Sequence, residues 1–60
     1  MPVYTLYCLD QAGKIERSEP LEANDDAEAL EAARALGRPH DCELWLRSRI
    51  VGRVPAASGR

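Results

Sequence analysis

A single helical segment, residues 27–36, sets the main limit on how this chain can fold. Its apolar residues, most of them alanine, fall on one side at helical spacing, and its charged residues fall on the other. Asp25 and Glu28 form an approximate capping box at its start, and Gly37 followed by Pro39 ends it. Because one helix can cover only one face of a sheet, we expect a two-layer domain whose other sheet face is open.

Four stretches in which apolar and polar residues alternate flank the helix, two on each side, at residues 3–9, 14–23, 42–47 and 50–54. Asp10–Gly13 is a turn signal between the first two stretches. Pro20 cannot donate to a strand ladder, so the second strand is expected at a sheet edge, with a bulge near Glu19. A right-handed crossover through the helix sets the third strand beside the first. The sequence therefore predicts an α+β domain, a ββαββ fold whose four-stranded antiparallel sheet has the order 2-1-3-4.

The same alternation assigns the side chains to the two faces of the sheet. The helix is expected to cover an inner set, namely Tyr4, Leu6, Cys8, Ile15, Leu44 and Leu46. The open face is expected to carry an outer set, namely Val3, Tyr7, Leu9, Trp45 and Val51. In the second hairpin, the favoured register sets apolar residues opposite apolar ones and acid opposite base. It pairs Leu46 with Ile50, Trp45 with Val51, Leu44 with Gly52, and Glu43 with Arg53.

The length of the chain allows one hydrophobic core. A chain of 60 residues buries only about 60% of the surface that it exposes when unfolded. Domains of this size often gain stability from a disulfide, a metal ion or a second subunit. We expect residues 1–54 to form the domain and residues 55–60 to be a flexible tail.

The first ten residues indicate where the protein works. They contain no basic leader and no long apolar run, so we expect neither a signal peptide nor a membrane span. The two cysteines of the chain are too few for a disulfide-framed secreted miniprotein. These features favour the reducing cytoplasm.

Three strings of residues carry a resemblance to known proteins: Tyr4-x-Leu6-x-Cys8-Leu9-Asp10, Asn24-Asp25-Asp26-Ala27-Glu28-Ala29 and Cys42-Glu43-Leu44-Trp45. With them the chain resembles, over nearly its whole length, a group of short, uncharacterised bacterial ββαββ proteins. That resemblance implies no activity. The chain is also loosely similar to HicB-type antitoxin domains, which place a hairpin before a helix that opens with acids and alanines. It departs from their pattern because a Trp-bearing hairpin ends the domain and no DNA-binding segment follows.

The sequence lacks the residue sets of the common catalytic and metal sites. Cys8, His40 and Cys42 are the only soft metal ligands apart from Met1, whereas a structural zinc ion needs four ligands. We therefore expect no metal and no cofactor, and we interpret both cysteines as free core residues, with a cross-strand disulfide as the alternative. Nucleophilic catalysis needs a nucleophile, a base and a pocket, and a two-layer domain of this size has little room for one. We predict that the protein is not an enzyme and has no small-molecule substrate.

Two functions remain from these observations. The outer set forms an apolar cluster on the open face, and such a cluster on a small protein usually marks an interface. The first prediction is a non-catalytic interaction domain, a homodimer or a complex with another protein, centred on Tyr7, Trp45 and Val51. The alternative is an RNA- or DNA-binding module that uses the arginine-rich second hairpin, through Arg47, Arg49 and Arg53.

The charge distribution is compatible with either function. Residues 1–33 contain two basic residues against eight acids, and residues 34–60 contain six basic residues against two acids. Such a split is found at nucleic-acid sites and at self-complementary interfaces. The net charge of −2 and the pI near 5.2 weigh against nucleic acid.

Overall fold

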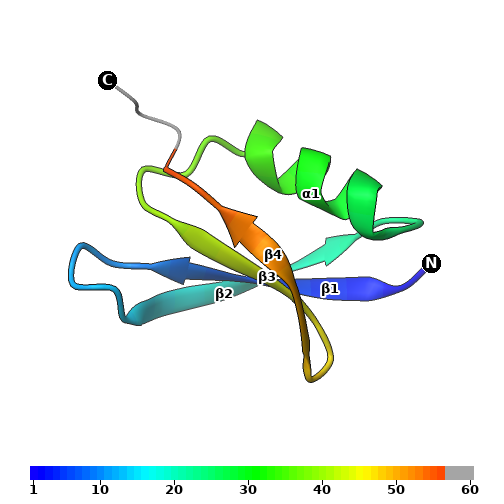
Figure 1. Ribbon diagram of the computed structural model, residues 1–60, viewed down its shortest axis with the longest axis horizontal. Coiled ribbons are helices and arrows are strands. Elements are labelled where there is room, and N and C mark those ends of the chain that lie inside the picture. The colour runs from blue at the N-terminus through cyan, green and yellow to red at the C-terminus, as the bar shows by residue number, and fades with distance from the viewer. Residues whose placement is uncertain (57–60) are drawn as a thin grey trace.

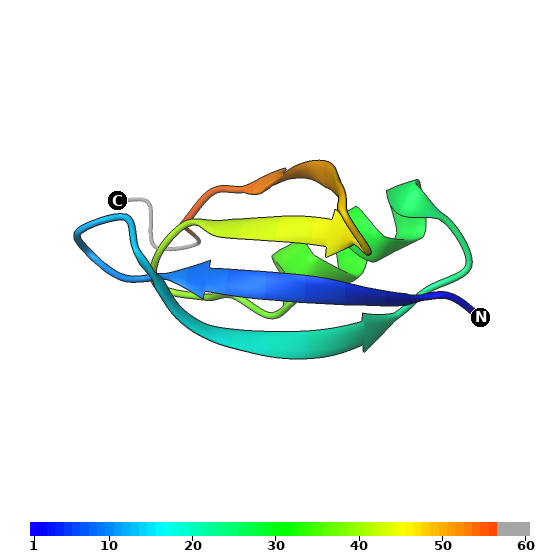
Figure 2. The same ribbon diagram turned by 90° about the horizontal axis from the view of Figure 1, so that it is seen from below.

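The computed structural model describes residues 1–56, and residues 57–60 of the predicted tail lie outside the described residues. Its elements are β1 Val3–Leu9, β2 Ile15–Glu22, α1 Asp26–Ala35, β3 Cys42–Leu46 and β4 Arg49–Val54. The strands form one antiparallel sheet in the order β2-β1-β3-β4. Helix α1 lies on one side of this sheet (Figure 1), and the view from below looks onto the side that α1 does not cover (Figure 2). The predicted ββαββ fold and its strand order are confirmed.

The ends of α1 follow the signals in the sequence. Asp25 is the N-cap, with an extended backbone, and its carboxylate accepts a 2.8 Å hydrogen bond from the Glu28 N–H. The Glu28 carboxylate in turn accepts a 2.6 Å hydrogen bond from the N–H of Asn24, the residue before the N-cap. At the other end, Gly37 has a φ of 64°, and its N–H donates to the Arg34 carbonyl. The helix therefore begins and ends at the capping residues that the sequence indicates.

The hydrophobic core lies between α1 and the two central strands. Tyr4 and Leu6 of β1 and Leu44 of β3 are almost completely buried there, against Ala29 and Ala33 of α1. The small alanine side chains let the helix approach the sheet closely. Among the described residues, no helix has both the length and the apolar character that crossing a bilayer requires.

A bulge in the first hairpin changes one predicted face. Leu9 pairs with Ile15 while Cys8 pairs with Arg17, so Glu16 is the extra residue of β2. Because one extra residue moves the next side chain to the other face, Ile15 lies on the open face and is 58% exposed. The prediction that α1 covers Ile15 is therefore wrong, and the bulge lies at Glu16 instead of near Glu19.

A second bulge, in β4, corrects the predicted register of the other hairpin. Leu44 pairs with Gly52 and Glu43 with Arg53, as predicted. Trp45 pairs with Ile50, however, and Leu46 with Arg49, because Val51 is the extra residue. Val51 packs against the core beside α1, whereas Ile50 is 45% exposed. The predicted pairs Trp45–Val51 and Leu46–Ile50 are therefore wrong, and so is the placement of Val51 on the open face.

Candidate interaction surface

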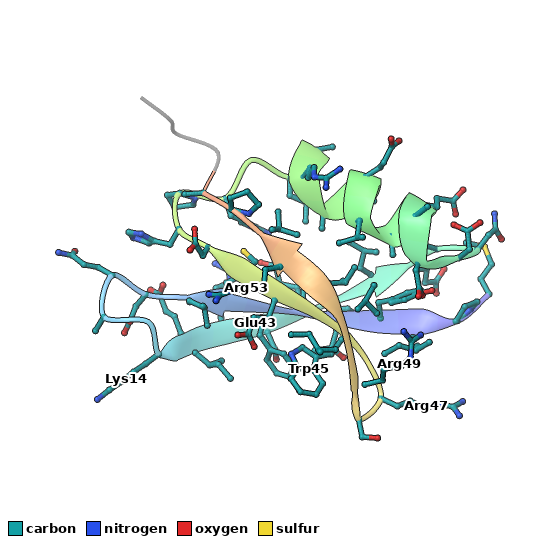
Figure 3. All side chains as sticks on the ribbon, in the orientation of Figure 1. Lys14, Glu43, Trp45, Arg47, Arg49 and Arg53 are labelled. Carbon is teal, nitrogen blue, oxygen red and sulfur yellow. The ribbon has the colours of Figure 1, made fainter. Side chains whose placement is uncertain are left out.

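An aromatic pair marks the centre of the open sheet face. Tyr7 of β1 and Trp45 of β3 lie diagonally across neighbouring strands, with ring centroids 6.3 Å apart and an interplanar angle of 83°. This edge-to-face geometry is favourable for two aromatic rings. Trp45 projects from the side of the sheet away from α1 (Figure 3), and its Nε1–H donates to Glu43 Oε1 at 3.2 Å. The tryptophan is thus held in one orientation on an open surface.

Exposed aliphatic residues surround this pair. Ile50 is the cross-strand partner of Trp45 on β4, and Ile15 lies near Tyr7 at the far end of β2. Val3, on the same face of β1, is 52% exposed. We refer to this set as the open-face patch, which consists of Val3, Tyr7, Ile15, Trp45 and Ile50.

The centre of the open-face patch is slightly hollowed. Tyr7, Ile15 and Trp45 line a depression of about 280 Å³ together with Glu43 and Arg47. Glu43, which is the cross-strand partner of Tyr7, and Arg47, in the β3–β4 turn, add an acid and a base to this lining.

The structure places only part of the predicted interface on the open-face patch. Val3, Tyr7 and Trp45 lie there, as predicted. Leu9 is only 6% exposed, and Val51 faces the core, so neither offers much surface to a partner. Their places are taken by Ile15 and Ile50, which the sequence analysis missed because each lies directly before the extra residue of a bulge, Glu16 or Val51.

The three arginines proposed for nucleic-acid contact do not share one surface. Arg53 stands opposite Glu43 on the open face. Arg47 lies in the β3–β4 turn, with a φ of 58°, and reaches the margin of the open-face patch. Arg49 instead faces α1, where its guanidinium contacts the Asp26 carboxylate at 3.2 Å. Figure 3 shows Arg53 beside Glu43, at a distance from the turn that carries Arg47.

Asp26 explains why Arg49 turns toward the helix. Its carboxylate also accepts a 2.8 Å hydrogen bond from the Tyr4 hydroxyl. The hydrogen bond from Arg49 lowers the pKa of Asp26 most, and the hydrogen bond from Tyr4 lowers it further. Burial, together with the nearby Asp26 carboxylate, raises the pKa of Tyr4. This cluster serves the fold and lies on the opposite side of the sheet from the open-face patch.

The two cysteines face each other beneath the helix. Cys8 and Cys42 are cross-strand partners on β1 and β3, and both are buried and free. Burial and the neighbouring Cys8 thiol raise the pKa of Cys42 to about 11, so this thiol is protonated at neutral pH. The interpretation of both cysteines as free core residues is confirmed. Within residues 1–56, no three His, Cys, Asp or Glu side chains come together as they would around a metal ion.

No protein-family model matches the sequence, and no curated protein and no solved structure matches it either.

Proposed function

We propose that this protein is a small non-catalytic interaction domain that self-associates through its open-face patch. The observation that carries the proposal is the Tyr7–Trp45 pair, held on a sheet face that α1 leaves open and flanked by exposed isoleucines. Trp and Tyr are enriched among the residues that contribute most to binding energy. An isoleucine that is about half exposed gains free energy when a partner removes it from water. A second copy of the chain offers the same apolar surface and would cover both the aromatic pair and the isoleucines.

The size of the face sets the expected strength of the dimer. Four strands about 4.8 Å apart, each about six residues long, give a face of roughly 20 by 20 Å. Stable complexes commonly bury about 800 Å² on each partner, which is more than such a face provides. We therefore expect a dimer that dissociates in the micromolar range, and a concentration series will be needed to detect it.

Substitution of Trp45 by alanine tests the proposal. Sedimentation velocity over about 5–500 μM should show a reversible monomer–dimer equilibrium for the wild type. The Trp45→Ala variant should dissociate at least about 30-fold more readily, because a central aromatic residue contributes about 2 kcal/mol or more. Leu36→Ala is the matched control, since Leu36 is 46% exposed but lies at the end of α1, away from the patch. A wild type that stays monomeric throughout the series would contradict the proposal.

The nucleic-acid alternative has weaker support from the geometry. Arg49 is engaged by Asp26, and the Glu43 carboxylate lies next to Trp45, where it would repel a phosphate. A mobility-shift titration with mixed RNA and DNA oligonucleotides at low salt tests the alternative. Binding that weakens steeply with salt and is lost in the Arg47→Ala and Arg53→Ala variants would favour it over self-association.

We also propose that the domain works in the cytoplasm. Two free thiols that face each other across neighbouring strands are typical of a reducing compartment, because an oxidising one favours their conversion to a disulfide. Mass spectrometry of protein purified from cells in the presence of an alkylating agent should find both thiols reduced. A mass 2 Da lower, from an internal disulfide, would argue for another compartment.

A further inference from the structure

We propose that two copies pack face to face about a two-fold axis parallel to their strands, so that Glu22 of one copy meets Arg47 of the other. This inference rests on the proposed self-association and adds its geometry. It assigns a role to charged residues at the margin of the open-face patch.

The fold converts the charge split of the sequence into opposite charges at the two edges of the sheet. The strand order places β2 at one edge and β4 at the other. On β2, Glu19 lies on the helix side and is paired with Arg17 and Arg38, whereas Glu16 and Glu22 form no ion pair among the described residues. Strand β4 and the turn before it carry no acid; Arg49 is paired with Asp26 on the helix side, whereas Arg47 and Arg53 lie at the open face. One edge is therefore acidic and the other basic.

Glu22 and Arg47 lie at the same end of the sheet but at opposite edges. Glu22 is the cross-strand partner of Val3, so its side chain points to the open face. Thr5 pairs with Trp45, and two further residues along each strand bring Val3 and Arg47 to one level. Val3 and Arg47 also line one hollow at this end of the molecule. Within residues 1–56 neither Glu22 nor Arg47 forms an ion pair, so both charges are available to a partner.

Symmetry then selects the orientation of the second copy. A two-fold axis parallel to the strands exchanges the edges of the facing sheets but keeps their ends together. It therefore sets the acidic edge of each copy over the basic edge of the other, with Glu22 above Arg47. Facing sheets pack about 10 Å apart, a gap that a glutamate and an arginine side chain can bridge together.

A two-fold axis across the strands is less favourable. It would set β2 over β2 and β4 over β4, which brings like charges together at the basic edge. Arg53 of one copy would then approach the turn that carries Arg47 of the other. In this orientation Glu43 would have to pair with Arg47, although Glu43 is already engaged by the Trp45 indole and faces Arg53.

Charge reversal tests the geometry. In sedimentation velocity at low salt, Glu22→Lys and Arg47→Glu should each weaken the dimer about tenfold or more. The effect is large because a two-fold symmetric dimer contains the Glu22–Arg47 pair at two places. The double variant, with both charges exchanged, should return to within about threefold of the wild type. The matched control reverses Glu31 and Arg34, an acid and a base exposed on α1.

The outcomes separate this inference from the proposed function. If the wild type dimerises and Trp45→Ala dissociates it, but the double charge variant is no better than the single variants, the orientation is wrong and the self-association stands. Loss of the dimer in Glu43→Lys with recovery in Glu43→Lys/Arg47→Glu would identify the axis across the strands and overturn the inference. A wild type that does not dimerise overturns both.

Discussion

The Tyr4 hydroxyl donates a 2.8 Å hydrogen bond to Asp26 Oδ1 and so joins the central strand β1 to the first turn of α1. The Tyr4 ring is almost completely buried, and a buried phenol needs a partner for its hydroxyl group. Arg49 brings β4 to the same carboxylate. The positive end of the helix dipole favours a negative charge at this position. The Asp26 carboxylate therefore links both β1 and β4 to α1.

The first prediction concerns acid stability and Asp26. Because the folded protein lowers the pKa of Asp26, the ionised carboxylate stabilises the fold above the usual aspartate pKa of about 3.9. This contribution is lost as the pH falls below that value through the folded pKa. We expect the thermal midpoint of the wild type to fall more steeply between about pH 4 and pH 2 than that of Asp26→Asn. Glu31→Gln, which removes an exposed helix carboxylate, should keep the wild-type slope; parallel curves for wild type and Asp26→Asn would contradict the prediction.

The second prediction concerns alkaline stability and Cys42. Its folded pKa of about 11 lies above that of an unfolded thiol, about 8.5. The neutral thiol therefore stabilises the fold below about pH 8.5, and this contribution is lost as the pH rises toward 11. Urea unfolding at pH 8 and pH 10.5 should show a larger loss of unfolding free energy for the wild type than for Cys42→Ala. Equal losses of unfolding free energy in the two proteins would show that folding does not raise the pKa of the Cys42 thiol.

The features that depend on residues close together in the sequence could be predicted from it. Helix α1 was predicted to within a residue or so because its caps, Asp25 and Gly37, act on neighbouring backbone groups. The strand order followed from two hairpins joined by one helix. Tyr7 and Trp45 were placed on the open face because no bulge separates them from the regular part of their strands.

The failures came from bulges, which local sequence does not determine. In β2, either Ile15 or Glu16 could be the extra residue without a change in the turn. In β4, the same holds for Ile50 and Val51. The choice depends on which side chain fits beneath α1, and hence on contacts distant in sequence. Val51 packs against the core, whereas Ile50 is 45% exposed on the open face. A one-residue shift of this kind exchanges a core residue for an exposed one.

The third prediction tests that exchange with two matched substitutions. Val51→Thr keeps the shape of the side chain but places a hydroxyl against the core, and it should lower the unfolding free energy by about 1–2 kcal/mol. Ile50→Thr keeps a β-branched residue on an exposed edge and should change the unfolding free energy by less than about 0.5 kcal/mol. In sedimentation, Ile50→Thr should weaken the dimer and Val51→Thr should not. The reverse pattern would restore the register in which Trp45 faces Val51.

The fourth prediction concerns a close approach of α1 to the sheet, at Gly52 and Leu30. A Cβ atom at Gly52 would lie 3.2 Å from Leu30 Cδ2, closer than ordinary van der Waals contact. Gly52→Ala requires only a small shift of the Leu30 methyl group, so its cost should be small. Gly52→Val adds two methyl groups at this point and should destabilise the protein by about 1–3 kcal/mol through overpacking.

A double-mutant cycle separates overpacking from any other effect of the valine. Leu30→Ala alone should destabilise the protein, because Leu30 packs against the core. In the Gly52→Val background the same substitution makes room for the valine, so its cost should be at least about 1 kcal/mol smaller. Unfolding in urea at pH 7, at a concentration where all variants are monomeric, measures the four free energies. Additive losses would mean that the valine acts on the strand itself, and that Gly52 is not required for the close packing of Leu30.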